Sequence, residues 1–276
     1  MPSFAAHDGT ELFERRFVPE GQIRANLVLI HGYAEHSGRY ERLGKELSAQ
    51  GYAVYALDLR GHGRSGGRRG YAAAFGDFTG DVGVYLDRLR GEGIKGPFML
   101  LSHSFGGLVS SHYVLEHPGE IEGLILSSPY FALALPVPKW EVVLGELCSS
   151  ILPKVALPTG IRGEDVSHDP AVAHEYETDP LINKKATARW FTESNRAQDE
   201  LFRRASEIKV PILMLQAAAD RVAAPAQSKA VFERLGSADK KLHMYDGLFH
   251  EVFNESEPGR GQVVSDLSSW LSTHQR

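Results

Sequence analysis

The sequence has almost no cysteine, no long apolar run and no excess of positive charge. Cys148 is the only cysteine among 276 residues, which excludes an internal disulfide and a zinc site built from several cysteines. No apolar run has membrane-spanning length, and the first residues lack the basic and apolar regions of a signal peptide. A net charge of −5, from 30 Lys and Arg against 35 Asp and Glu, argues against a nucleic-acid-binding surface. We therefore expect a cytoplasmic protein that binds no nucleic acid.

The sequence does contain a regular alternation of short apolar runs and helical patterns. A hairpin is expected over 4–17, and the wholly apolar run 27–30 is of the buried-strand type. Further apolar runs cover 52–57, 98–101, 121–126, 211–215 and 242–245, and candidate helices cover 40–49, 78–89 and 108–116. This alternation predicts an α/β fold, a mostly parallel sheet flanked by helices, with ligands at the carboxyl ends of the strands.

The alternation breaks over residues 129–200, where prolines cluster. We expect this segment to be an inserted helical cap, or lid, which divides the core into a first part, 1–128, and a second part, 201–276. Within the cap, helical spacing of apolar residues predicts an amphipathic helix that carries Trp140, Val143, Leu144, Leu147, Cys148 and Ile151. Its apolar stripe packs on the main domain, or lines a tunnel, or touches a membrane surface; periodicity does not separate these alternatives.

The clearest chemical signal is a serine at the end of the apolar run 98–101. The tract Ser102-His103-Ser104-Phe105-Gly106 has the layout of a nucleophile elbow, a sharp strand-to-helix turn that presents the Ser104 hydroxyl. The usual pattern is Gly-x-Ser-x-Gly, and Ser102 stands here in place of the first glycine. The turn also aims the backbone N–H of Phe105 at the reaction centre, where it can stabilise an oxyanion.

A serine hydroxyl is a poor nucleophile at neutral pH, so it needs an imidazole base that a carboxylate holds in place. Asp220 follows the apolar run 211–215, and His250 follows the run 242–245. The chain order Ser104, Asp220, His250 is that of the α/β-hydrolase fold. These three residues are the predicted catalytic triad.

The sequence offers other candidates for the acid and the base. Asp246 is close in sequence to His250 and remains an alternative acid. The tract after 121–126, where some hydrolases carry the acid, has no carboxylate. His103 is expected to pack beneath the elbow, and His243 is expected to lie within a strand.

Two loops and several cap tracts carry a family resemblance. The loop after the first buried run reads His31-Gly32-Tyr33-Ala34-Glu35-His36-Ser37-Gly38-Arg39-Tyr40, and the Tyr33 N–H is the expected second oxyanion donor. Together with Asp58-Leu59-Arg60-Gly61-His62-Gly63-Arg64-Ser65 and the cap tracts Ser167-His168-Asp169-Pro170 and Asp179-Pro180-Leu181, it resembles the monoacylglycerol lipase and lysophospholipase group of the α/β-hydrolase superfamily. The resemblance covers nearly the whole chain. One departure is Ala217, where the family commonly has glycine.

The resemblance implies an α/β-hydrolase fold and a serine hydrolase that cleaves monoacylglycerols to fatty acid and glycerol through an acyl-enzyme on Ser104. It implies an oxyanion hole formed by the amides of Tyr33 and Phe105. It also implies a polar pocket for glycerol built with Glu35 and Arg39, for which a local salt bridge that orients the loop is the alternative.

Several alternatives to this function stay open. A lysophospholipase or a broad carboxylesterase would use the same triad, and a non-catalytic ligand-binding protein could use the same scaffold. The expected partner is a small lipid ester, with transient membrane contact through the cap; no cofactor and no metal is expected. The tract 61–66 matches G-x-G-x-x-G, but helical periodicity begins only after Gly76, so we expect no dinucleotide site. His31, Glu35 and His36 lack the spacing of a zinc motif.

Overall fold

The central element of the fold is a mostly parallel sheet. The computed structural model describes residues 3–134 and 139–275, and for 139–144 it describes the backbone alone. Within these residues the main sheet has eight strands, in the order β1 (Ser3–Ala5), β2 (Glu11–Phe17), β4 (Tyr52–Leu57), β3 (Ala25–Ile30), β5 (Phe98–His103), β6 (Gly123–Ser127), β9 (Ile212–Ala217) and β10 (Lys240–Tyr245). The strands from β4 to β10 pair in parallel, whereas β1 and β2 form an antiparallel hairpin at one edge. The predicted α/β sheet is confirmed.

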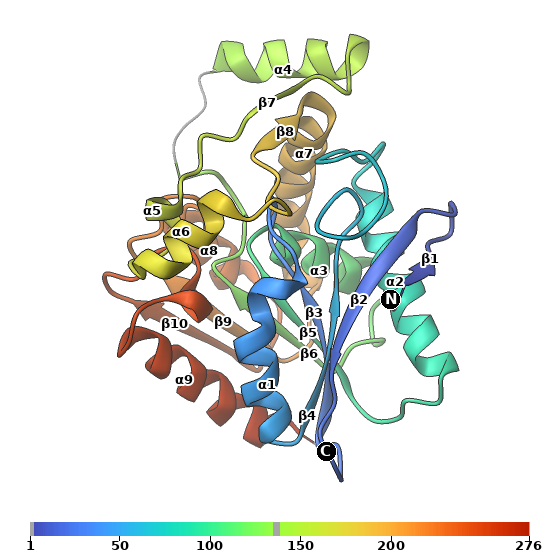
Figure 1. Ribbon diagram of the computed structural model, residues 1–276, viewed down its shortest axis with the longest axis vertical. Helices are drawn as coiled ribbons and strands as arrows, with labels where there is room; N and C mark the ends of the chain where they lie inside the picture. Colours follow the sequence, from blue (N-terminus) through green and yellow to red (C-terminus); the bar gives the residue numbers. More distant parts are fainter. Residues whose placement is uncertain (1–2, 135–138, 276) are drawn as a thin grey trace.

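Helices cover both faces of this sheet (Figure 1). One face packs against α2 (Gly76–Gly91), α3 (Phe105–Glu116), α7 (Ala188–Arg204) and α8 (Pro225–Arg234). The other face packs against α1 (Glu41–Ala49) and α9 (Gly259–His274). Strands β3, β4, β5, β6 and β9 are buried at every position. This two-sided burial is why their sequences are nearly continuous apolar runs.

The segment predicted to be a cap lies between β6 and the end of α7. It contains α4 (Lys139–Ile151), β7 (Ala156–Pro158), α5 (Gly163–Val166), α6 (Pro170–Thr178) and β8 (Lys185–Thr187), and β7 pairs with β8 in a small separate sheet. In Figure 1, α4 and β7 stand at the top of the molecule, away from the main sheet. The predicted boundary at residue 200 falls inside α7, whose Ala197 and Leu201 are buried in the main core.

Polar contacts attach the lower part of this segment to the main domain. Nε2 of His36 lies 2.9 Å from Oδ2 of Asp179, and the Asn183 amide donates to the Ala34 carbonyl. These contacts fix α6 and β8 over the loop that follows β3. Within the described residues, no helix combines the length and the apolar character that crossing a membrane requires.

Candidate active site

Ser104 sits in the strained turn that joins β5 to α3. Its φ of 50° and ψ of −118° place it in a region that side chains rarely adopt. The turn is held because the Ser104 amide donates to the Ser127 carbonyl and the Ser104 carbonyl accepts from Gly107 and Tyr130. At Gly106, an added Cβ would overlap the carbonyl oxygens of Ile30 and His31. The small residue is therefore required by the close approach of β3. Ser102 fits within β5, where its hydroxyl lies 2.5 Å from that of Ser110.

Asp220 and His250 meet beside this turn. Asp220 follows β9 and His250 follows β10, and Nδ1 of His250 lies 2.7 Å from Oδ2 of Asp220. The other Asp220 oxygen accepts from the amides of Val222 and Ala223, which fixes the carboxylate. A carboxylate at Nδ1 favours the tautomer with a proton there, leaving Nε2 free to accept one. Asp246, the alternative acid, is exposed.

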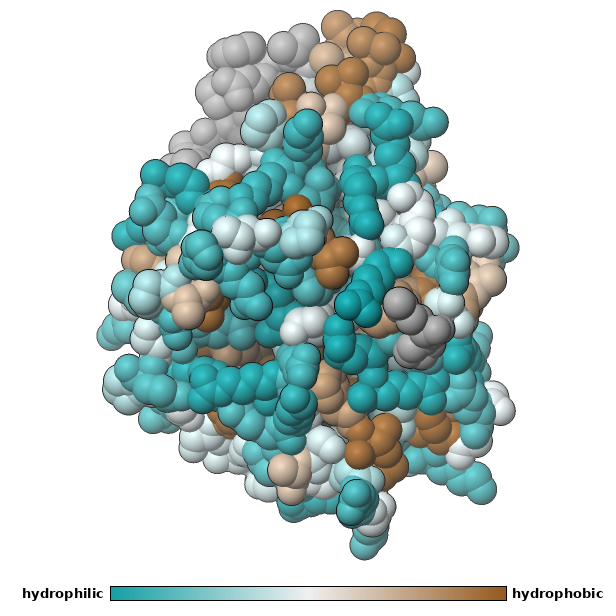
Figure 2. Space-filling model, in the orientation of Figure 1, coloured by the Kyte–Doolittle hydropathy of each residue, from teal (hydrophilic) through white to brown (hydrophobic). Residues whose placement is uncertain are grey.

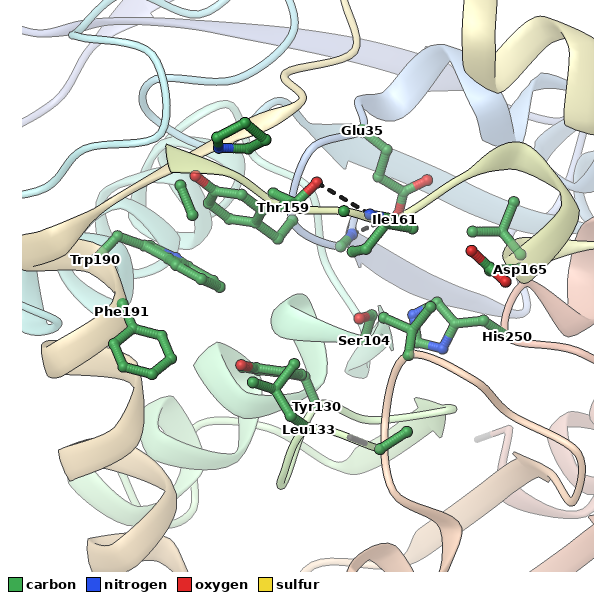
Figure 3. A pocket seen from close by; sticks show the side chains of 18 of the residues that line it. Glu35, Ser104, Tyr130, Leu133, Thr159, Ile161, Asp165, Trp190, Phe191 and His250 are labelled. Atoms are coloured by element: carbon green, nitrogen blue, oxygen red, sulfur yellow. Dashed lines mark hydrogen bonds between the residues drawn. The ribbon is translucent and has the colours of Figure 1, made fainter. Parts of the chain in front are cut away.

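The imidazole of His250 is buried with Ser104 at one cavity (Figure 3). Burial opposes protonation of the ring, but the carboxylates of Asp220, Glu251 and Glu35 outweigh it and raise the pKa of His250 above 6.5. No hydrogen bond joins the Ser104 hydroxyl to His250 in the described part of the chain. His103 packs beside His250 at 4.6 Å between ring centroids, and burial lowers its pKa well below 6.5. His103 therefore stays neutral.

The loop after β3 passes close to the nucleophile. A Cβ added at Gly32 would lie 3.0 Å from Cβ of Ser104, so the loop comes close to the nucleophile at Gly32. The Tyr33 amide belongs to the next residue. The Tyr33 amide makes no hydrogen bond within the described residues. Phe105 is the first residue of α3, a position whose amide has no partner inside its own helix. Both predicted oxyanion donors thus flank Ser104.

Glu35 and Arg39 belong to a buried charge cluster. Oε1 of Glu35 accepts from the Gly32 amide at 2.5 Å and from the Tyr40 hydroxyl at 2.6 Å, which ties the carboxylate to the loop. Nη2 of Arg39 donates to Oε2 of Glu251 at 2.6 Å, and its Nε lies 3.6 Å from Oε2 of Glu35. Burial and the Glu251 charge raise the pKa of Glu35 to about 7, against the opposing effect of Arg39. Glu35 lines the cavity, whereas Arg39 does not.

The cavity has a volume of about 1160 Å³ and extends from Ser104, Asp220 and His250 to the segment predicted to be a cap. Its apolar wall comes from both the core and the cap and includes Tyr130, Leu133, Val155, Leu157, Ile161, Trp190 and Phe191. Figure 3 shows Trp190, Phe191 and Tyr130 on one side of Ser104, with Glu35 and Asp165 toward the other. The site is therefore amphipathic, with an apolar chamber and an acidic end on either side of the serine.

The predicted amphipathic helix is only partly described. Leu147 and Ile151 of α4 are exposed to solvent, at 56% and 66%, so they do not pack on the main domain. Cys148 lines the cavity instead. The side chains of Trp140, Val143 and Leu144 lie outside the described residues.

Sequence reasoning missed two acidic residues near His250. Glu251 lines the cavity and holds Arg39, which is 212 positions away in the sequence. Glu255 is buried and accepts from the amides of Phe249 and His168, which joins the loop that carries His250 to the cap. The tract from Glu251 to Glu255 contains two acids beside the base, and that density of charge was the available signal.

Comparison with known proteins gives matches over core and cap alike. The family model described as serine aminopeptidase, S33 (Hydrolase_4) matches residues 21–257. A monoacylglycerol lipase of Mycolicibacterium smegmatis is 32% identical, over 99% of this chain and 96% of that protein. The phospholipase YtpA of Bacillus subtilis is 30% identical, over 84% of this chain and 90% of that protein. The crystal structure of Paleococcus ferrophilus monoacylglycerol lipase superposes with a TM-score of 0.88 at 30% identity, over 96% of this chain and 99% of that one.

Proposed function

Because this chain belongs to the serine aminopeptidase, S33 (Hydrolase_4) family of α/β-hydrolases, we propose that it hydrolyses monoacylglycerols to a free fatty acid and glycerol. The chain is a serine hydrolase of the lipase and esterase type. The observation that carries the finer assignment is the amphipathic cavity, which places an apolar chamber and an acidic end on either side of Ser104. One acyl chain and one small polar alcohol match that division.

The proposed reaction is acyl transfer to Ser104. Nε2 of His250 removes the hydroxyl proton while Asp220 stabilises the imidazolium, and the Ser104 oxygen attacks the ester carbonyl. The amides of Tyr33 and Phe105 stabilise the oxyanion. His250 then returns its proton to the departing alkoxide. Water, activated by the same imidazole, hydrolyses the acyl-enzyme and releases the fatty acid.

A lysophospholipase is the second candidate, and a broad carboxylesterase follows it. The same apolar chamber would accept the single acyl chain of a lysophospholipid, and one relative at 30% identity carries the name phospholipase. A ligand-binding protein without turnover would not need the strained serine beside a hydrogen-bonded His250 and Asp220 pair. The geometry therefore favours an enzyme.

The experiment that tests this function measures fatty acid release from a matched panel of esters. The panel contains monoacylglycerol, diacylglycerol, triacylglycerol, lysophosphatidylcholine and a short p-nitrophenyl ester, and Ser104→Ala is the control. We expect the highest kcat/KM on monoacylglycerol. Preference for lysophosphatidylcholine would make the enzyme a lysophospholipase that uses the same triad. Activity on the short ester alone would indicate a general esterase, and no activity on any ester would indicate a binding protein.

We also propose that the cap makes transient contact with lipid surfaces. Leu147, Ile151 and Leu152 at the end of α4 are each more than half exposed, and Leu157 of β7 is exposed at 68%. Figure 2 shows hydrophobic side chains gathered at the top of the molecule, over this part of the cap. Exposed apolar side chains in one place favour partition into a lipid interface, where monoacylglycerols reside.

A further inference from the structure

Two buried carboxylates, Glu35 and Glu251, line the acidic end of the cavity and share one guanidinium, that of Arg39; Glu35 is mostly ionised only above its pKa of about 7. Three carboxylates surround Arg39: Glu251 at 2.6 Å, Glu35 at 3.6 Å and Glu175 at 3.8 Å. The side chains of Arg39, Glu35 and Glu251 are each at most 4% exposed. Water therefore screens their charges weakly.

The order of these groups decides what a ligand meets. Glu35 and Glu251 line the cavity, whereas Arg39 does not. Oε2 of Glu251 accepts from Arg39 and Asn254, and its Oε1 makes no hydrogen bond within the described residues. A ligand at this end of the cavity therefore contacts Glu35 and Glu251, and Arg39 is not part of the cavity wall.

Two arginines also line the cavity, but both are solvated and paired. The Arg162 side chain is 64% exposed and lies 2.7 Å from Glu164. The Arg221 side chain is 52% exposed, lies 3.8 Å from Asp165 and stacks over the Phe249 ring. These cations belong to the outer part of the cavity and do not offset the buried carboxylates beside His250.

The leaving alcohol must lie at this acidic end. His250 gives its proton to the alkoxide, so the alcohol is on the His250 side of the ester. Glu251 is the residue that follows His250 in the chain. The carboxylates already act on this position, because Glu251 and Glu35 contribute to the raised pKa of His250.

We propose that Glu35 and Glu251 form a charge filter that discriminates against esters whose alcohol carries a negative charge. Uncharged hydroxyl-bearing alcohols and cationic alcohols pass this filter, since carboxylates accept hydrogen bonds and attract cations. A phosphorylated alcohol is repelled at the point where it must bind and leave. The inference rests on the proposed function only in taking the enzyme to cleave esters with the alcohol on the His250 side.

The test is run at pH 8, where the Glu35 carboxylate is mostly ionised, and uses three soluble esters with the same acyl chain and different alcohols: 1-butyrylglycerol, butyrylcholine and 1-butyrylglycerol 3-phosphate. For the wild-type enzyme, we expect kcat/KM on the phosphate ester to be at least tenfold below that on each of the other two. Butyrylcholine controls for bulk and for charge as such, because its head group is large and charged but carries the opposite sign to the phosphate. A phosphate ester cleaved within tenfold of butyrylglycerol, or a choline ester as poor as the phosphate ester, would overturn the proposal.

Variants assign the effect to the named carboxylates. We call the ratio of kcat/KM on the choline ester to kcat/KM on the phosphate ester the gap. Glu251→Gln and Glu35→Gln, made separately, should each lower this gap at least threefold. Glu257→Gln removes a carboxylate that is 56% exposed and off the cavity, and should leave both the gap and the basal activity unchanged. An unchanged gap in both folded variants would refute the assignment. If one variant fails to fold, the other and the wild-type panel still decide the proposal.

This outcome is separable from that of the proposed function. Monoacylglycerol specificity is judged on long-chain lipids, whereas the charge filter is judged on the ratio between choline and phosphate esters of one acyl chain. An enzyme that prefers lysophosphatidylcholine would refute monoacylglycerol specificity and still show the filter.

Discussion

Nδ1 of His250 lies 2.7 Å from Oδ2 of Asp220, and the carboxylate side chain has no exposed surface. The two residues follow neighbouring parallel strands, β10 and β9, so the sheet itself brings them together. A buried carboxylate at this nitrogen fixes the tautomer that can accept a proton from Ser104. In the proposed mechanism, this pair activates the Ser104 hydroxyl as the nucleophile.

Substitutions in the triad should abolish turnover without unfolding the chain. Ser104→Ala and His250→Ala should remove nearly all ester hydrolysis, and Asp220→Asn should lower kcat roughly 10³- to 10⁴-fold by favouring the wrong tautomer. Steady-state kinetics on a soluble ester, with thermal melting as the check on folding, measures this. The matched control is Asp246→Asn, an exposed position that should keep wild-type activity. The assignment fails if Asp246→Asn is the inactive one of the two asparagine variants.

The pH dependence of kcat/KM should follow the neutral form of His250. Because its pKa lies above 6.5, activity should fall as the pH decreases through an apparent pKa above that value. Removing a negative charge favours the neutral imidazole and lowers its pKa. Glu251→Gln should therefore move the acidic limb to lower pH, as measured by a pH series on an uncharged soluble ester. A limb that moves to higher pH would contradict the electrostatic account.

Arg39 should matter for stability more than any exposed arginine. Arg39→Met leaves Glu35 and Glu251 buried without their shared cation, which should cost roughly 3–5 kcal/mol of unfolding free energy. Urea denaturation measures this loss. Arg42→Met removes a guanidinium that is 62% exposed and paired only at the surface, so it should cost less than about 1 kcal/mol. Equal effects of the two changes would show that the buried cluster does not need Arg39.

The elbow should tolerate no side chain at Gly106. A methyl group there overlaps the backbone of β3, so Gly106→Ala should destabilise the fold by about 1–3 kcal/mol and displace Ser104. Gly80→Ala within α2 is the control, because its added Cβ meets only the His7 ring at 3.6 Å. This change should stabilise the chain by about 0.5–1 kcal/mol through helix propensity. Thermal melts of both variants, together with esterase activity, give the comparison, and a fully active Gly106→Ala would argue against the strained turn.

The exposed end of α4 should control binding to lipid surfaces. The double change Leu147→Glu and Ile151→Glu places charges on apolar positions that do not line the cavity. It should weaken sedimentation with phospholipid vesicles several-fold and leave hydrolysis of a soluble ester unchanged. Val18→Glu, at an apolar position 49% exposed outside the cap, should have no effect on vesicle binding. Equal vesicle binding by the double variant and the wild type would refute lipid contact through this helix.

Local signals in the sequence explain what could be predicted. Buried parallel strands are continuous apolar runs, and an elbow needs small residues beside its serine. Both β5 and the turn at Ser104 can therefore be predicted from one short segment of sequence. The contact between Arg39 and Glu251 has no local signature, because it depends on how the loop after β3 and the loop after β10 approach each other. The periodicity of apolar residues also does not predict the short elements of the cap. Elements such as α5 and β8 are too short for a pattern and are held by contacts with the core.

The proposed mechanism requires that monoacylglycerol hydrolysis proceed through Ser104. The most direct test is labelling with a fluorophosphonate probe, followed by peptide mass spectrometry and by measurement of residual monoacylglycerol hydrolysis at each degree of labelling. We expect one label per chain, located on Ser104, and a loss of hydrolysis in direct proportion to the labelling. Complete labelling with undiminished hydrolysis, or inactivation by a label on any other residue, would rule out Ser104 as the nucleophile.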